Sequence, residues 1–171
     1  MDAATLRSTQ APLKERYRAD AAAARVTLKA SGTLDDSHIA CKVETGRALA
    51  VAGLHPATGG SGLELCSGDM LLEALVACAG VTLKAVATAL EIPLESGRVS
   101  AEGDLDFRGT LGVAKDAPVG FAAIRLRFDL ASVAPQEKLD QLLKLTERYC
   151  VVYQTLRGGV PLDVRMSSAG R

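Results

Sequence analysis

The pattern of apolar and polar positions divides the chain into alternating segments and apolar or amphipathic helical ones. Alternation with a period of two, which is typical of strands with one buried face, occurs at several places. It predicts strands at about 25–30, 39–43, 47–51, 98–107, 121–130 and 160–166. A turn cluster at 32–37, rich in Gly, Asp and Ser, separates the first two strands and predicts a hairpin.

Three segments predict helices. The segment 70–90 is apolar nearly all round, which is typical of a buried central helix; Ser67 or Asp69 is the expected N-cap, and Pro93 the stop. A second helix is expected to start with Pro135 as its first residue. After a break near 149–150, a short apolar helix follows at 151–156.

The order β-β-β-α-β-β-α-α-β, with strands grouped around one buried helix, indicates an α+β fold. Residues 1–22 are expected to be an N-terminal appendage, in which Leu6, Leu13 and Tyr17 could dock a short helix. Residues 23–171 are expected to form one domain.

Composition and charge exclude several classes of function and indicate a cellular setting. The chain has 171 residues and a formal net charge of zero, which argues against nucleic acid as the main partner. The longest uncharged run in the central helix, 74–83, is 10 residues, whereas a membrane span needs about 20. No signal peptide is visible, so a reducing, cytoplasmic setting is expected. Four cysteines are too few for a disulfide framework, and a disulfide there would more readily be catalytic.

Two of the cysteines are candidates for chemistry. Cys78 lies in the central helix, where a small core residue is the alternative interpretation. Cys150 lies at the expected helix break, where the N–H groups of the next helix would stabilise its thiolate, with Arg148 adding charge; a buried cysteine at a junction is the alternative. Cys41 is expected in the core. Cys66, in a loop, has no neighbour that marks it as reactive.

The sequence has no pattern typical of a zinc site or of a phosphate-binding loop. His38 and His55 are both expected at the surface, and neither has the spacing to cysteine or carboxylate that a zinc site requires, so no metal is expected. The glycines at 59, 60 and 62 lack the Gly-Lys-Ser/Thr of a phosphate-binding loop.

Two stretches together resemble the OsmC/Ohr family. Residues 67–83, SGDMLLEALVACAGVTL, look like the central-helix motif of that family, which ends in Ala-Cys. Residues 147–156, ERYCVVYQTL, resemble its second motif, in which a cysteine precedes a short helix and a last strand. The resemblance covers roughly 25–166.

The resemblance implies an OsmC-like fold, with two β-sheets around long central helices in an intertwined homodimer. It also implies a thiol-dependent hydroperoxide reductase active in oxidative or osmotic stress defence. Cys78 would attack the O–O bond of a peroxide and become a sulfenic acid, and Cys150 would resolve it as a disulfide. An external dithiol would reduce the disulfide, without any bound cofactor.

The sequence departs from the family pattern at three positions. Gly68 stands where the family usually has Glu, with Asp69 one residue later, and Val151 replaces a common Pro. The N-terminal turn at 31–36 lacks the family's arginine. We therefore expect Arg25 or Arg47 to supply the positive charge near Cys78, oriented by Asp69 or Glu73.

Two alternatives to a peroxidase stay open at this point. The missing turn arginine favours a non-catalytic small-molecule-binding or structural dimer that keeps the fold. Another thiol-dependent reaction, such as acyl transfer, has weaker support because no His stands next to a candidate Cys.

Overall fold

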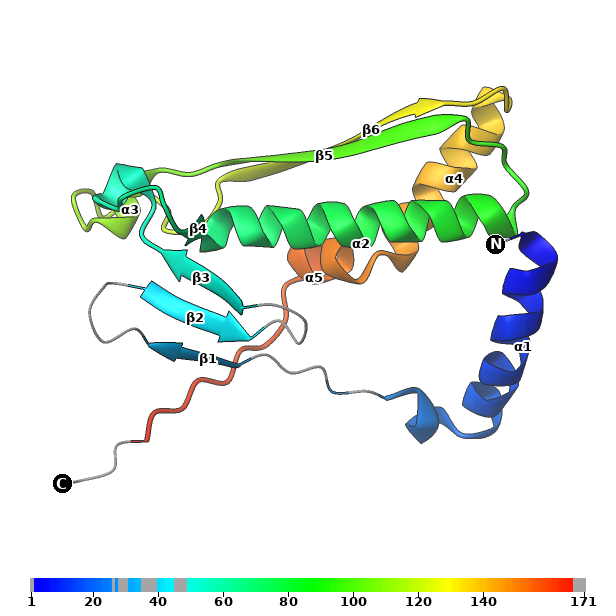
Figure 1. Cartoon of the computed structure of the whole chain (residues 1–171), viewed down its shortest axis with the longest axis horizontal. Coiled ribbons are helices and arrows are strands. Elements are labelled where there is room, and N and C mark those ends of the chain that lie inside the picture. Colours follow the sequence, from blue (N-terminus) through cyan, green and yellow to red (C-terminus); the bar gives the residue numbers. More distant parts are fainter. Residues whose placement is uncertain (1, 26, 28–30, 35–39, 45–48, 168–171) are drawn as a thin grey trace.

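The computed structural model describes residues 2–25, 27, 31–34, 40–44 and 49–167 (Figure 1). Its helices are α1 (Ala3–Ala19), α2 (Ser67–Ala89), α3 (Phe107–Thr110), α4 (Gln136–Tyr149) and α5 (Val151–Gly158), with short 3-10 turns η1 (Ala21–Ala24) and η2 (Pro56–Thr58). Its strands are β1 (Ser31–Leu34), β2 (Ala40–Glu44), β3 (Leu49–Gly53), β4 (Leu65–Cys66), β5 (Ser96–Asp104) and β6 (Ala123–Ala131).

The strands form two sheets on either side of α2. One sheet has the order β1-β2-β3-β4, antiparallel except for the parallel pair β3–β4. The other is the antiparallel hairpin β5–β6, in which Ser96 faces Ala131 and Asp104 faces Ala123. In Figure 1 this hairpin follows the length of α2, while α4 and α5 pack against the same helix. The α+β fold predicted from the sequence is confirmed.

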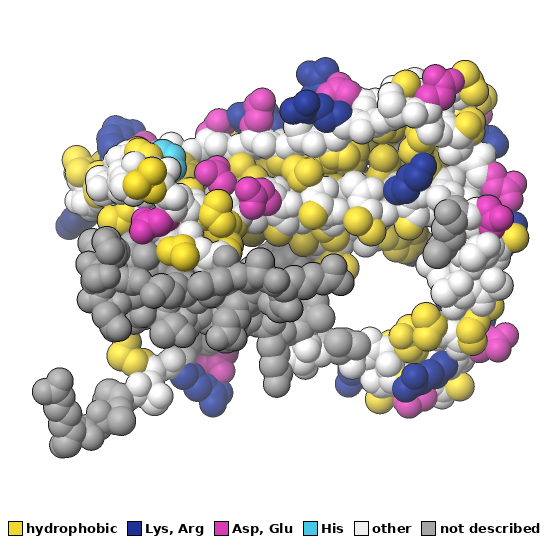
Figure 2. All heavy atoms as spheres, in the orientation of Figure 1, with side chains coloured by type: hydrophobic (Ala, Val, Ile, Leu, Met, Phe, Trp, Pro, Cys, Tyr) yellow, Lys and Arg dark blue, Asp and Glu magenta, His cyan; other side chains and the backbone are white. Residues whose placement is uncertain are grey.

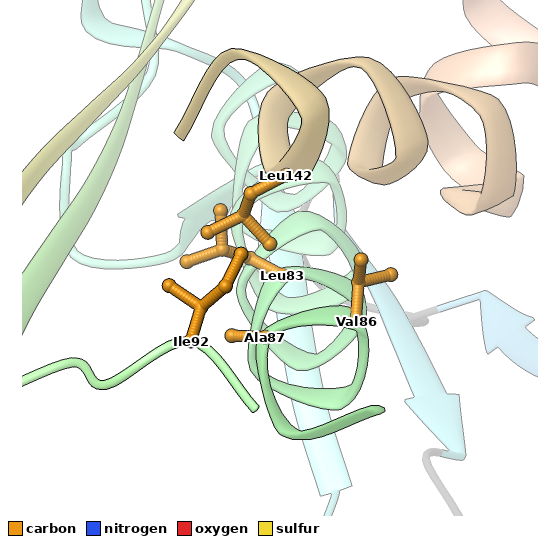
Figure 3. Packing of buried hydrophobic residues seen from close by; sticks show 5 residues of the cluster. All are labelled: Leu83, Val86, Ala87, Ile92 and Leu142. Carbon is orange, nitrogen blue, oxygen red and sulfur yellow. The ribbon is translucent and has the colours of Figure 1, made fainter. Parts of the chain in front are cut away.

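The core lies where α2 meets α4. Leu83, Val86 and Ala87 of α2 pack with Ile92 and with Leu142 of α4 (Figure 3). Leu142 is fully buried. These positions recur on α2 at intervals of three and four, so one side of the helix is inside and the other is left open.

The open side of α2 carries a regular stripe. Its members recur at alternating intervals of four and three residues, and each is exposed or only partly buried; they are Met70, Ala74, Ala77, Val81, Lys84 and Thr88. The Val81 side chain is 73 % exposed. An interval that averages 3.5 residues is the repeat by which one helix packs against a second along its length. Figure 2 shows hydrophobic side chains along α2 at the surface in this view.

By length and composition alone, the 23-residue helix α2 is also apolar enough to cross a membrane, because an 18-residue window within it reaches a mean hydropathy of 1.8. The charge-interruption argument made from the sequence therefore does not by itself exclude a span. The core helix of a soluble protein meets the same measure. Here α2 packs against β5, α4 and α5.

Three boundaries in the N-terminal half differ from the sequence-based expectation. Residues 32–34, expected in a turn, belong to β1, while 35–37 lie outside the described residues. The expected strand at 25–30 also falls mostly outside them, and Arg25 caps η1 instead. The N-cap of α2 is Cys66, with no side-chain cap hydrogen bond, so neither Ser67 nor Asp69 fills that position. Helix termini depend on local backbone geometry that residue type specifies only weakly.

The C-terminal half differs at two places. Pro135 is the N-cap of α4 rather than its first residue. Residues 160–167 form no strand, although Val160, Leu162, Val164 and Met166 alternate as predicted. These four side chains are 55 % to 96 % exposed. Alternation encodes a strand with one buried face, but a strand needs a neighbouring backbone to form, and within the described residues none pairs with this segment.

The N-terminal appendage is a longer helix than expected. α1 has 17 residues, with Asp2 as N-cap and Pro12 inside it, and it buries no side chain. Its first turns lie beside the end of α2, where Arg7 forms an exposed ion pair with Glu91 at 3.3 Å. The rest of α1 and η1 extends away from the body of the molecule (Figures 1 and 2).

Candidate functional site

Cys78 and Cys150 lie together where the middle of α2 meets the start of α5. The pairing follows from the local structure: the α4 helix ends at Tyr149, Cys150 caps both helices, and α5 begins at once and packs on α2. Cys78 is half-buried, Cys150 is 1 % exposed, and both are free thiols. The two thiols are close enough for each to shift the pKa of the other.

The pKa of the Cys78 thiol is lowered by its surroundings. Burial raises the pKa, but hydrogen bonds to the sulfur lower it by more in total. The donors are the backbone N–H groups of Val152 and Val151, the Cys150 thiol and the Thr82 hydroxyl. The first-turn N–H groups of α5 have no partner within their helix, and they carry the positive end of the helix dipole. The surroundings of Cys78 therefore favour its thiolate form.

The pKa of Cys150 is shifted in the opposite direction. Burial raises it most, and the hydrogen bond to Cys78 together with the negative charge of that sulfur raises it further. The N–H groups of Tyr153 and Val152 lower it by less. The opposite shifts make Cys78 the more acidic of the two thiols and Cys150 the one that keeps its proton longer as the pH rises.

This assignment corrects one expectation from the sequence. The start of the short helix was expected to stabilise a thiolate at Cys150, but its N–H groups from Val151 and Val152 point at Cys78. Arg148 does not supply charge to either sulfur in the structure. Its guanidinium lies over the Tyr149 ring, 5.5 Å from the centroid.

The charged residues named from the sequence are not brought to Cys78 within the described residues. Arg25 is exposed at the end of η1, and Arg47 lies outside the described residues. Asp69 and Glu73 are exposed on α2. Asp69 precedes Cys78 by nine residues of one helix, which is about 13 Å along the axis, so it cannot contact this sulfur in its own chain.

Sequence reasoning missed the groups that lower the pKa of Cys78. Thr82 follows Cys78 by four residues on α2, and this spacing alone indicates that the two side chains are neighbours. The Val151 and Val152 amides cannot be recognised from residue type, because every residue except proline has a backbone N–H group. They become visible only once the packing of α5 on α2 is known.

A second group of polar side chains surrounds the start of α2. His55, Cys66, Asp69 and Asp104 line a cavity of about 370 Å³, and the His55 ring stacks on Phe107 with centroids 4.8 Å apart. His55, expected at the surface, is thus partly buried. Among the described residues no group of three His, Cys, Asp or Glu side chains could hold a metal ion. Cys41 and His38 have no described side chains.

A further cavity is bordered by α2 and α5, the helices that meet at the cysteine pair. It has a volume of about 900 Å³ and lies between β6, α4, α5 and α2. Its lining is mainly aliphatic and aromatic, and includes Leu75 and Tyr153, each three residues from one of the cysteines. Its charged lining residues are two arginines, Arg127 and Arg157, and two acids, Asp140 and Glu147.

The family model described as OsmC-like protein matches residues 60–165, which contain α2, the β5–β6 hairpin, α4, α5 and both cysteines. The chain belongs to the OsmC-like protein family. A search of curated proteins finds no match to this sequence.

Solved structures show that the OsmC-like fold extends beyond the matched segment. An OsmC-like protein from Mycoplasma pneumoniae superposes with a TM-score of 0.65 at 16 % identity, covering 78 % of this chain and 89 % of that one. An organic hydroperoxide resistance protein OsmC from Legionella pneumophila superposes with a TM-score of 0.61 at 15 % identity, covering 78 % of this chain and 93 % of that one. An organic hydroperoxide resistance protein from Elizabethkingia anophelis superposes with a TM-score of 0.61 at 18 % identity, covering 79 % of this chain and 91 % of that one. At these identities the likeness establishes the fold.

Proposed function

We propose that this OsmC-like protein is a thiol-dependent hydroperoxide reductase, with Cys78 as the attacking thiolate and Cys150 as the resolving thiol. The observation that carries the proposal is the opposite shift of two neighbouring thiols, Cys78 toward the thiolate and Cys150 toward the thiol. Family membership and the likeness to organic hydroperoxide resistance proteins support a redox role in peroxide defence.

In the first step the Cys78 thiolate attacks the outer oxygen of a peroxide, ROOH. The O–O bond breaks, ROH leaves after taking a proton, and Cys78 becomes a sulfenic acid. The N–H groups that lower the pKa of Cys78 favour the ionised sulfur that the attack requires. The mainly apolar cavity bordered by α2 and α5 suits an organic R group.

In the second step Cys150 closes a disulfide. Its sulfur, deprotonated as the reaction proceeds, attacks the Cys78 sulfur and releases water. Because the two thiols are close enough to shift each other's pKa, the disulfide is expected to form without a large rearrangement of the chain. An external dithiol then returns both sulfurs to thiols by two-electron exchange, so the cycle needs no resident cofactor and suits a reducing, cytoplasmic setting.

We also propose that the working form is a homodimer built on α2. The open stripe of α2 has the spacing of a helix–helix contact, with Ala77 and Val81 at its centre. The exposed charges of α2 on either side of this centre are opposite in sign, with Glu73 toward the start of the helix and Lys84 toward its end. Antiparallel pairing with a second copy, with a two-fold axis near Cys78 and Ala79, brings each Lys84 opposite the partner's Glu73.

The test is peroxide consumption by purified variants with a dithiol as reductant. Cys78→Ser is expected to abolish turnover. Cys150→Ser is expected to reduce one equivalent of peroxide and to stop as a sulfenic acid, which a sulfenic-acid-specific probe detects. Cys66→Ser, which changes a cysteine outside the pair, is the matched control and should keep full activity.

Peptide mapping after mild peroxide treatment provides a second measurement, and a 78–150 disulfide is the expected product. A wild-type chain that consumes no peroxide, with oxidation only at Cys41 or Cys66, would exclude the reductase. The large cavity would then favour the alternative, a non-catalytic binder of apolar small molecules.

A further inference from the structure

α1 is a helix without a buried face in its own chain. None of its 17 residues is buried, and Leu13 and Tyr17 are 44 % and 40 % exposed. Leu6, Leu13 and Tyr17 recur at intervals of seven and four, so they share one face of the helix. Isolated helices of this length are marginal in water, and a proline in the interior weakens α1 further. The helix therefore needs a surface to pack against.

Among the described residues, the first turns of α1 contact α2. There Leu6 faces Val81, Lys84, Ala85 and Thr88 of α2, and together they line a notch of about 290 Å³. Three of these α2 residues, Val81, Lys84 and Thr88, belong to the open stripe. α1 thus forms a wall beside the second half of the stripe, and leaves an apolar recess there.

The proposed antiparallel dimer determines what faces this recess. With the two-fold axis near Cys78 and Ala79, the partner's Met70 lies opposite the turn between Lys84 and Thr88. Met70 is the large apolar residue at the start of the stripe and is only partly buried in its own chain. A flexible methionine suits an irregular recess.

Charge favours the same placement. Between Ala3 and Ala19, α1 carries Arg7, Lys14, Arg16 and Arg18 against Glu15 alone. The start of α2 carries two exposed acids, Asp69 and Glu73. In the antiparallel arrangement the basic α1 of one copy stands beside the acidic first turns of the partner's α2.

We propose that α1 is a dimerisation arm, which receives Met70 of the second copy in the notch between Leu6 and the end of α2. This inference rests on the proposed dimer. It adds a contact formed by residues outside the segment that the family model matches.

Crosslinking between two differently marked chains tests this contact directly. An equimolar mixture of full-length Leu6→Cys and Met70→Cys chains is treated with a short bismaleimide, and the linked peptides are identified by mass spectrometry. Each chain has only one of the two new cysteines, so a 6–70 link must join two copies. The matched control is Leu6→Cys mixed with Val133→Cys, an apolar residue 77 % exposed at the β6–α4 turn. We expect the 6–70 link and no 6–133 link.

Sedimentation equilibrium of the full-length variants gives the energetic measure. Leu6→Ala and Met70→Ala should each raise the dimer dissociation constant by about tenfold, because each removes apolar burial. The double variant should be little worse than either single variant, since both remove the same contact. A dimeric wild type with no 6–70 link and an unchanged constant in Leu6→Ala would overturn the arm and leave the dimer standing. A wild type that stays monomeric at high concentration would overturn both.

Discussion

The pKa of the Cys78 thiol is set by two opposing effects that act at the sulfur itself. Burial favours the neutral thiol, whereas the N–H groups of α5, the Cys150 thiol and the Thr82 hydroxyl favour the thiolate, and the second effect is larger. A helix N-terminus can thus take the part for which the sequence analysis invoked an arginine from the N-terminal region.

This view of Cys78 predicts the effect of removing one donor. Thr82→Val keeps the shape of the side chain but removes the hydroxyl, and we expect the apparent pKa of Cys78 to rise by about one unit. The measurement is the pH dependence of iodoacetamide alkylation at Cys78. Since only the thiolate reacts, the alkylation rate falls as the pH drops through this pKa, so the variant's profile should shift to higher pH.

A matched threonine on the same helix is the control. The Thr88 hydroxyl donates to the Lys84 carbonyl oxygen at 2.8 Å, and Thr88 lies nearly three turns away from Cys78, at the far end of the helix. Thr88→Val should leave the alkylation profile unchanged. An equal shift in both variants would show that general changes in α2, and not the hydroxyl at 82, set the pKa.

Among the elements, those that the sequence predicts well are the ones whose signal is local. The central helix and the strands of the β5–β6 hairpin follow from periodicity in their own residues, and they form within a few residues of the expected limits. The segment 160–166 has an equally clear alternation but needs a second backbone, so its sequence could not show that no strand forms. The position of the α5 N–H groups beside Cys78 likewise depends on tertiary packing.

The end of α2 predicts a stabilising substitution. Glu91 has a φ of 56°, in the left-handed region where a side chain costs about 1 kcal/mol or more and where glycine is favoured after a helix. Glu91→Gly should therefore raise the free energy of unfolding by about 1 kcal/mol, measured by urea denaturation. The ion pair that it loses with Arg7 is exposed on both sides and contributes little.

The control for Glu91→Gly is a second exposed glutamate nearby. Glu95 has no positive φ, so Glu95→Gly should give no gain and should lower stability slightly through backbone entropy. If both variants have a higher free energy of unfolding, the cause is the removal of a negative charge and not the relief of backbone strain at position 91.

At the scale of the whole molecule, the chain leaves apolar surface that a single copy does not cover. The open stripe of α2, the face of α1 and the alternating residues 160–166 are all exposed, although each has the spacing of an element that packs against another. The sequence pattern alone cannot locate their partner, because contacts between copies leave no separate periodicity. A two-fold pair along α2 would cover the first of these surfaces and bring the others near it.

The position of the two-fold axis can be tested by exchanging charges. Glu73→Lys or Lys84→Glu alone places like charges opposite each other in the antiparallel pair, and each should raise the dimer dissociation constant severalfold at low salt. The double variant restores opposite charges at both places, so its constant should return toward that of the wild type. Sedimentation equilibrium at two salt concentrations measures all four chains, and high salt should reduce the differences. If the double variant dimerises no better than the single variants, Glu73 and Lys84 do not face each other, and the axis lies elsewhere than the middle of α2.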